Sequence, residues 1–177
     1  RTYLKQVKYP LSVRSSSQME DAHYQPYAGL YRTYMIPNND SDLTVRLTQL
    51  TTAIKLVYAS TYFEGPRLYS MSTANQHSEE SMAVIIQELA GCQYKDYFYP
   101  TISGVAQSYN YYPFSKMKAE EGIIHMALGF GKTVVDGEKC IRFSPKYPTI
   151  MPEFSIVEDM LANSQRTFYA LRINNYP

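Results

Sequence analysis

A long amphipathic helix is the strongest structural signal in this sequence. Between residues 42 and 59, apolar side chains recur at steps of four, three, four and three positions, which places them on one helical face. They are Leu43, Leu47, Leu50, Ile54 and Val57. Either Asp40 or Ser41 is available as the cap of the first turn. The sequence therefore predicts one helix over residues 42–59.

Strands are predicted for the second half of the chain. Residues 82–86 are continuously apolar and rich in β-branched side chains, which predicts a strand buried on both faces and central in its sheet. Further strands are expected at residues 104–109, 123–128, 133–135 and 140–143. Asp136 and Gly137 separate the last two, and this dipeptide is a strong hairpin signal.

Two more helical segments complete the predicted pattern. One begins near Ser60 and is interrupted by Gly65 and Pro66. The last begins at Ser155 and continues through Phe168, with Ser155 and Glu158 forming a capping box. Helices followed by strands and a closing helix indicate an α+β fold with a mixed or antiparallel sheet. We expect a single domain, with a helical part at 1–75 and a strand-rich part at 80–177.

The amino-acid composition limits the classes of partner that we expect for the chain. The 17 basic and 16 acidic side chains give a net charge of +1, so no nucleic-acid or membrane partner is expected. No apolar run approaches the roughly 20 residues of a membrane helix. Cys92 and Cys140 are expected to be free thiols in a reducing, cytoplasmic compartment. The chain begins at Arg1 rather than methionine, so we expect it to be a piece of a longer protein.

Arg14 followed by three serines, residues 15–17, suggests anion binding. The arginine fork matches phosphate geometry, and hydroxyls with backbone N–H groups complete a cradle. A solvated turn is the alternative, because serine clusters often mark loops. Residues 129–133 resemble the end of a P-loop, but Met126 stands where its first glycine is required. The three histidines lack metal-ligand spacing, and His125 is expected to be a core residue.

A group of tyrosines allows two interpretations. They are Tyr94, Tyr97, Tyr99, Tyr109, Tyr111 and Tyr112. On strands, such residues usually form half-buried cross-strand pairs. The alternative is a non-catalytic module whose tyrosine surface binds carbohydrate or a protein partner.

Four ordered blocks resemble the nucleotide-binding part of the phosphoenolpyruvate synthase and pyruvate phosphate dikinase family. The blocks are VRSSSQMEDAHYQPYAGLYRTYM, MAVIIQELAG, FYPTISGVAQSYNYYP and ALGFGKTVVDGEKCIRFSPKYP. The resemblance implies an ATP-grasp fold that holds ATP between two α+β lobes. It also implies an ATP-dependent phosphotransferase that passes a phosphoryl group to a histidine on another domain.

The resemblance assigns roles to individual residues. It implies that Arg14 grips the nucleotide phosphates, and that Gly29 and Thr33 line the phosphate end. It implies that residues 87–89, namely Gln87, Glu88 and Leu89, form the hinge that meets adenine.

Two glycine blocks extend the implied site. Gly104 falls in a Ser-Gly-Val block, and Gly129 and Gly131 fall in a Gly-Leu-Gly block. Lys132 stands where the family commonly has an acidic residue after this block, so an acid role there is not expected.

Other parts of the family machinery are not matched. The metal-binding Glu and Gln should follow a Glu-Trp segment, but the chain has no tryptophan, so Mg²⁺ ligands are expected outside it. The phosphate-binding lysine would precede Arg1, and the acceptor histidine lies on a phosphohistidine carrier domain. The expected partners are that carrier and a phosphoenolpyruvate/pyruvate domain of the same polypeptide. The resemblance leaves open a related phosphotransferase with another acceptor, and we expect this chain alone to be inactive.

Overall fold

The structure is a computed structural model that describes residues 1–17, 29–72 and 81–174. Its contacts divide the chain into two compact units. Unit 1 comprises Arg1–Leu89 and the C-terminal segment from Leu171 onward, and unit 2 comprises Ala90–Ala170.

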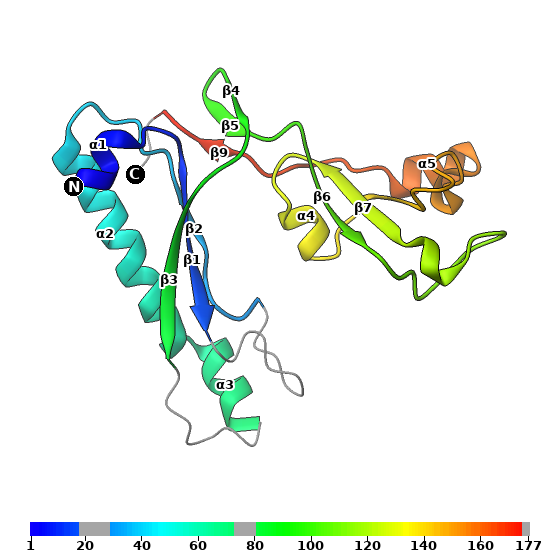
Figure 1. The fold of residues 1–177 in the computed structure, drawn as a ribbon, viewed down its shortest axis with the longest axis horizontal. Helices are drawn as coiled ribbons and strands as arrows, with labels where there is room; N and C mark the ends of the chain where they lie inside the picture. The colour runs from blue at the N-terminus through cyan, green and yellow to red at the C-terminus, as the bar shows by residue number, and fades with distance from the viewer. Residues whose placement is uncertain (18–28, 73–80, 175–177) are drawn as a thin grey trace. The chain divides into compact units, whose positions relative to one another are not determined.

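Unit 1 contains a three-stranded antiparallel sheet with a long helix packed along it (Figure 1). Its elements are α1 (Thr2–Gln6), β1 (Leu11–Ser17), β2 (Tyr34–Ile36), α2 (Leu43–Ala59), the 3-10 helix η1 (Ser60–Tyr62), α3 (Glu64–Ser72), β3 (Met82–Glu88) and β9 (Leu171–Arg172). The strand order is β2-β1-β3, so β1 lies in the middle.

Side-chain alternation along β1 gives this sheet a closed and an open face. Leu11 and Val13 are fully buried, whereas Arg14 is exposed. The buried residues form the core cluster of unit 1, which contains Leu4, Leu11, Val13, Ile36, Leu50, Ala53 and Val57. Because successive strand residues point to opposite faces, α2 covers one face and Arg14 lies on the other. We call this second face the open face.

The predicted long helix is confirmed as α2, but its cap is Asp42. The Asp42 Oδ1 atom accepts a hydrogen bond from the Thr44 backbone N–H at 2.7 Å. Asp40 instead accepts from the Asp42 N–H at 2.7 Å, two residues before the cap. Asp42 caps because it occupies the extended position immediately before the helix.

A buried arginine fixes the chain segments around α2. Arg46 is only 6% exposed. Its Nε donates to Asn38 Oδ1 at 2.9 Å, and its Nη2 donates to the carbonyls of Leu4 and Val7 at 2.6 and 2.5 Å. Asn38, at φ +52°, also donates from Nδ2 to the Val7 and Tyr9 carbonyls. One guanidinium and one amide thus satisfy a carbonyl of α1 and two carbonyls of the segment that follows it.

Two predictions for unit 1 were wrong. Gly65 and Pro66 do not interrupt the second helix, because they lie in the first turn of α3, where proline is tolerated. Residues 82–86 are not buried on both faces. Burial alternates along β3, Ile85 is 38% exposed, and β3 lies beside β1 rather than at the centre of the three strands.

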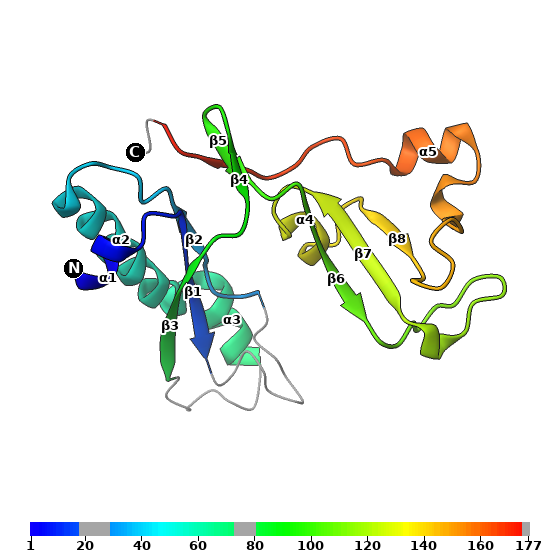
Figure 2. The ribbon, with the colours of Figure 1, turned by 45° about the horizontal axis from the view of Figure 1, so that its top comes forward.

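Unit 2 contains a β-hairpin and a second three-stranded antiparallel sheet (Figure 2). Its elements are β4 (Cys92–Tyr94), β5 (Tyr97–Tyr99), β6 (Ile102–Gln107), the 3-10 helix η2 (Ala119–Glu121), β7 (Ile123–Leu128), α4 (Lys132–Val135), β8 (Ile141–Phe143), the 3-10 helix η3 (Pro152–Phe154) and α5 (Val157–Asn163). The second sheet has the order β6-β7-β8. Small antiparallel sheets with few helices confirm the α+β prediction.

The predicted hairpin across Asp136 and Gly137 is wrong. Residues 132–135 form the short helix α4, and Gly137 at φ +71° ends it. The Gly137 N–H donates to the Val134 carbonyl, and the Glu138 N–H donates to the Thr133 carbonyl at 2.9 Å. This pair of bonds is a Schellman motif, which uses the same Asp-Gly chemistry as a hairpin turn.

The predicted closing helix is shorter than expected. Helix α5 covers Val157–Asn163, and its N-cap, Ile156, forms no side-chain cap. The capping box of Ser155 and Glu158 is therefore wrong. Phe168 lies beyond the helix. Gln165, also beyond it, forms two hydrogen bonds with the backbone of Leu128: its Oε1 accepts from the Leu128 N–H, and its Nε2 donates to the Leu128 carbonyl.

Some of the grouped tyrosines form cross-strand pairs, and others are exposed at the surface. Tyr94 and Tyr97 pair across β4 and β5, and Tyr94 stacks on Tyr99 with ring centroids 4.5 Å apart. Tyr111 and Tyr112, by contrast, are 74% and 90% exposed. The cross-strand interpretation therefore holds for the hairpin, but not for the segment after β6.

We expect Arg46→Met to lower the free energy of unfolding by about 2–5 kcal/mol, because buried acceptors that lose a charged donor cost roughly 1–3 kcal/mol each. Urea denaturation followed by circular dichroism measures the change. Lys55→Met is the matched control, since Lys55 is an exposed cation on the same helix. Equal stability of the two variants would show that the Arg46 contacts contribute nothing.

Candidate functional site

The open face of unit 1 brings two sequence-predicted site residues together. The strand register places Ser12 between Met35 on β2 and Gln87 on β3, and pairs Arg14 with Ile85. Paired residues of an antiparallel sheet project from the same face. Arg14 and Gln87 are therefore diagonal neighbours on the open face, and both are exposed.

Thr33 adjoins this pair. The β1–β2 pairing ends at Val13 and Tyr34, next to Arg14 on one strand and to Thr33 on the other. Thr33 is exposed and immediately precedes β2. The sheet thus places a cation and an amide on one surface, and Thr33 lies at the adjoining end of β2.

The serines that follow Arg14 do not all share its surface. Ser15 and Ser17 are 4% and 6% exposed and lie on the face covered by α2. Ser16, opposite Ala83, projects from the open face. The segment is a strand rather than a turn, and its period of two leaves Ser16 as the one serine of this run on the same face as Arg14.

The other two hinge residues are placed differently from Gln87. Glu88 is opposite Leu11, on the face toward α2. Burial, and secondarily the Glu88 carboxylate, raise the pKa of the Tyr3 phenol on α1. The Leu89 N–H donates to the Pro10 carbonyl at 2.9 Å, so this N–H is already engaged.

The predicted glycines fall into both units. Gly29, at φ +75°, is an exposed turn residue of unit 1 that directly follows the segment 18–28, which lies outside the described residues. Gly104, Gly129 and Gly131 belong to unit 2.

Close backbone packing explains two of the glycines in unit 2. A Cβ at Gly104 would collide with the His125 carbonyl of the paired strand. Gly129 has φ +80°, and a Cβ there would lie 2.7 Å from the Tyr169 carbonyl oxygen. A Cβ at Gly131 would have only ordinary contacts, 3.8 Å from Ser103 Oγ. Gly131 is therefore the one of the three that packing does not require.

The side chain of Lys132, which follows Gly131, is held by contacts within unit 2. Lys132 forms an ion pair with Asp136 one helical turn away and lies over the Tyr169 ring at 5.3 Å. The hydrogen bond to Asp136 raises the pKa of the Lys132 ammonium. Lys132 therefore stays charged at neutral pH.

The described ranges hold neither a cluster of side chains that could bind a metal ion nor a helix that could cross a membrane. Within residues 1–17, 29–72 and 81–174, no three His, Cys, Asp or Glu side chains come together as a metal site. No helix in these ranges has both the length and the apolar character needed to cross a bilayer. Cys92 and Cys140 are free thiols.

Sequence analysis missed two apolar residues of the open face. Met35 and Ile85 lie on it beside Ser12 and Arg14. A continuous apolar run hides which of its members project to which face, so Ile85 gave no signal. The polar residue Gln87 was the available clue, because it fixes the phase of the alternation in β3.

We expect Gly129→Ala to destabilise unit 2 by about 2–4 kcal/mol, because positive φ and a blocked Cβ position each cost roughly 1–2 kcal/mol. Gly137→Ala is the control, since Gly137 also has positive φ but open space around its Cβ position. Gly131→Ala should leave stability within about 0.5 kcal/mol, as substitutions without a named mechanism do. Urea denaturation compares all three, and a Gly129 variant no less stable than the Gly137 variant would contradict this account.

Comparison with protein-family models identifies the family of the chain. The family described as pyruvate phosphate dikinase, AMP/ATP-binding domain, matches residues 2–174. No curated protein matches the chain significantly. The family match covers both units, including every residue assigned above from the resemblance. The chain therefore belongs to the family of the AMP/ATP-binding domain of pyruvate phosphate dikinase, an ATP-binding part of an ATP-dependent phosphotransferase.

Proposed function

We propose that the open face of unit 1 binds ATP as one lobe of an ATP-grasp domain in a phosphoenolpyruvate synthase-like enzyme. The observation that carries the proposal is the common exposure of Arg14 and Gln87 on one face of one sheet. A nucleotide site needs a cation for the phosphates and polar groups for the base. The cation and the polar groups must lie a short distance apart, because the ribose separates phosphate from base. Diagonal neighbours on a sheet supply that separation.

Each end of the nucleotide has a proposed set of contacts. Arg14 holds phosphate oxygens through its guanidinium fork, and the Thr33 hydroxyl adds a donor beside it. Gln87 meets the polar edge of adenine with its side-chain amide. Because the Leu89 N–H is engaged by Pro10, we assign the Leu89 carbonyl rather than its N–H to the base.

The remaining predicted residues have weaker roles in the proposal. Glu88 contributes backbone alone, because its side chain belongs to the opposite face. Gly29 permits backbone approach at the phosphate end. Gly104 and Gly129 shape unit 2 through close packing, and a nucleotide role for Gly131 stays a prediction from the resemblance.

The proposed reaction transfers a phosphoryl group to a histidine on another domain of the same polypeptide. Such transfer depends on positioning and on neutralising phosphate charge, which Mg²⁺ supplies when bound. The described residues form no acidic cluster for the ion, so we assign its ligands to residues outside them. Arg14 neutralises part of the phosphate charge. The final acceptor and the cytoplasmic location stay predictions.

We expect millimolar Mg-ATP to shift backbone amide signals of Arg14 and of residues 85–89 in a labelled sample of the 177-residue chain. Binding is expected to be weak, because the described residues form no acidic cluster that could hold Mg²⁺. No ATP consumption with pyruvate is expected. Shifts confined to residues 94–112 would contradict the proposal and favour the tyrosine-surface alternative.

In the full-length parent enzyme, we expect Arg14→Ala to weaken ATP binding by about 1.5–3 kcal/mol, the range for hydrogen bonds to charged groups. Arg14→Lys should not restore binding, because an ammonium lacks the planar fork. Calorimetry with Mg-ATP measures both variants. Lys55→Ala is the control, since Lys55 lies on the helix that covers the opposite face. Unchanged affinity in Arg14→Ala would exclude Arg14 from the phosphate site.

A further inference from the structure

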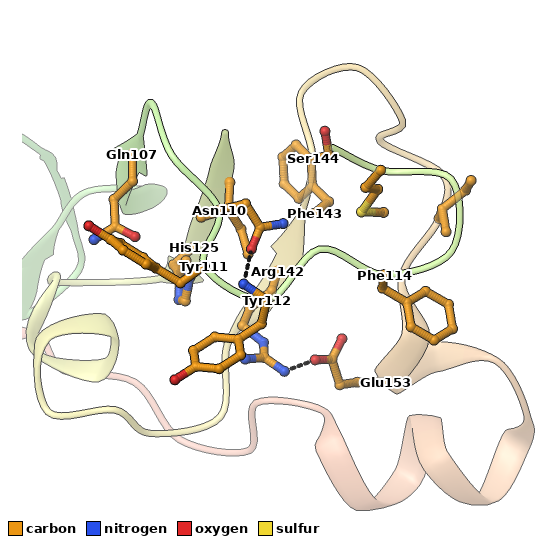
Figure 3. Close-up of a pocket in the computed structure, with 13 residues that line it drawn as sticks. Gln107, Asn110, Tyr111, Tyr112, Phe114, His125, Arg142, Phe143, Ser144 and Glu153 are labelled. Carbon is orange, nitrogen blue, oxygen red and sulfur yellow. Dashed lines mark hydrogen bonds and ion pairs between the residues drawn. The ribbon is translucent and has the colours of Figure 1, made fainter. Parts of the chain in front are cut away.

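A cavity of about 400 Å³ in unit 2 contains none of the residues assigned to ATP (Figure 3). Strands β7 and β8 supply His125 and Arg142, which are paired directly across the sheet. The loop after β6 supplies Tyr111 and Tyr112, and η3 supplies Glu153. The volume falls within the range of small-molecule sites, about 300–1,000 Å³.

The charged groups of the cavity cancel one another. Arg142 Nη2 forms an ion pair with Glu153 Oε1 (Figure 3). Burial, and secondarily the Arg142 charge, lower the pKa of His125, so its imidazole is neutral at pH 7. A neutral imidazole offers one donor and one acceptor. The cavity therefore has many polar groups and no net charge.

Two residues of the cavity wall each carry a side-chain oxygen that has no hydrogen-bond partner among the described residues. These oxygens are Ser144 Oγ and Glu153 Oε2, and both atoms are buried. Ser144 itself is only 1% exposed. Buried polar atoms in native proteins are nearly always satisfied. A carboxylate oxygen can only accept, so its missing partner must be a donor.

Aromatic rings form the outer wall. The side chain of Tyr112 is 90% exposed. Its backbone is nevertheless fixed, because the Tyr112 N–H donates to Asn110 Oδ1 at 3.0 Å. Asn110 is 3% exposed, and its N–H donates to the Ala119 carbonyl at 2.7 Å. Tyr111 meets Tyr109 edge to face, with ring centroids 4.9 Å apart. A held loop thus presents tyrosine rings at low entropic cost.

We propose that this cavity binds a neutral sugar ring. Sugar hydroxyls both donate and accept, so they satisfy Glu153 Oε2 and Ser144 Oγ together, while the C–H face of the ring packs on tyrosine. A phosphate or carboxylate ligand would bring a charge that the neutral cavity does not balance, and its anionic oxygens could not donate to Glu153 Oε2. An apolar ligand would leave both buried oxygens unsatisfied, at a cost in binding free energy.

The test is saturation-transfer NMR on the 177-residue chain with glucose, galactose, mannose, N-acetylglucosamine, maltose and cellobiose at tens of millimolar. We expect at least one of these sugars to bind and to shift the amide signals of residues 110–114 and 142–144. Tyr112→Ala and Glu153→Gln should each weaken that binding about tenfold or more, as expected for losing one stacking ring or one charged acceptor. Tyr62→Ala is the control, because Tyr62 is an 80% exposed tyrosine of unit 1.

Each outcome decides the proposal. The substitution of Tyr112 removes an exposed ring and should leave the amide spectrum of the fold unchanged, so loss of binding in it reports the ring itself. Failure of all six sugars to bind overturns the inference, as does equal affinity in the Tyr112 and Tyr62 variants. Shifts of residues 142–144 produced by ATP without sugar also overturn it, because they would make the cavity a nucleotide site. This result is separate from the Arg14 test, which concerns unit 1.

Discussion

The guanidinium of Arg46 is the contact on which unit 1 depends. It lies inside the protein and is held by oxygens of Leu4, Val7 and Asn38 rather than by a carboxylate. A buried cation is costly unless such oxygens surround it. Because these oxygens come from α1 and from the segment before α2, the arginine fixes both against the helix. The helix in turn closes one face of the sheet and leaves the other open.

Strand alternation then determines what the open face can display. The same period of two that buries Leu11 and Val13 projects Arg14 outward, so core formation and ligand contact are set by one register. A shift of one residue in the β1–β3 pairing would turn Arg14 into the core. The position of the cation is therefore as well specified as the core itself.

Local patterns predicted some elements well and others poorly. The helix at 43–59 and the strand at 123–128 were predictable because their periodicity or β-branched content had no strong competitor. Asp136 and Gly137 were ambiguous, because a glycine with positive φ serves a hairpin and a helix C-terminus equally. For the site, Arg14 and Gln87 carried chemical signals. The cavity around Glu153 did not, because its lining residues come from several elements between Gln107 and Glu153 that only the fold brings together.

The chain passes from unit 1 into unit 2 after Leu89 and returns at Leu171, so unit 2 is an insertion. The returning segment is tied back to unit 1 by Asn39 Nδ2, which donates to the Ile173 carbonyl at 3.0 Å. While unit 1 stays folded, an unfolded unit 2 is a closed loop of about 80 residues rather than a free chain. By the loop-entropy relation used for cross-links, such closure raises stability by about 4–5 kcal/mol. The folded core around Arg46 thus acts on unit 2 as a covalent staple would, through chain connectivity alone.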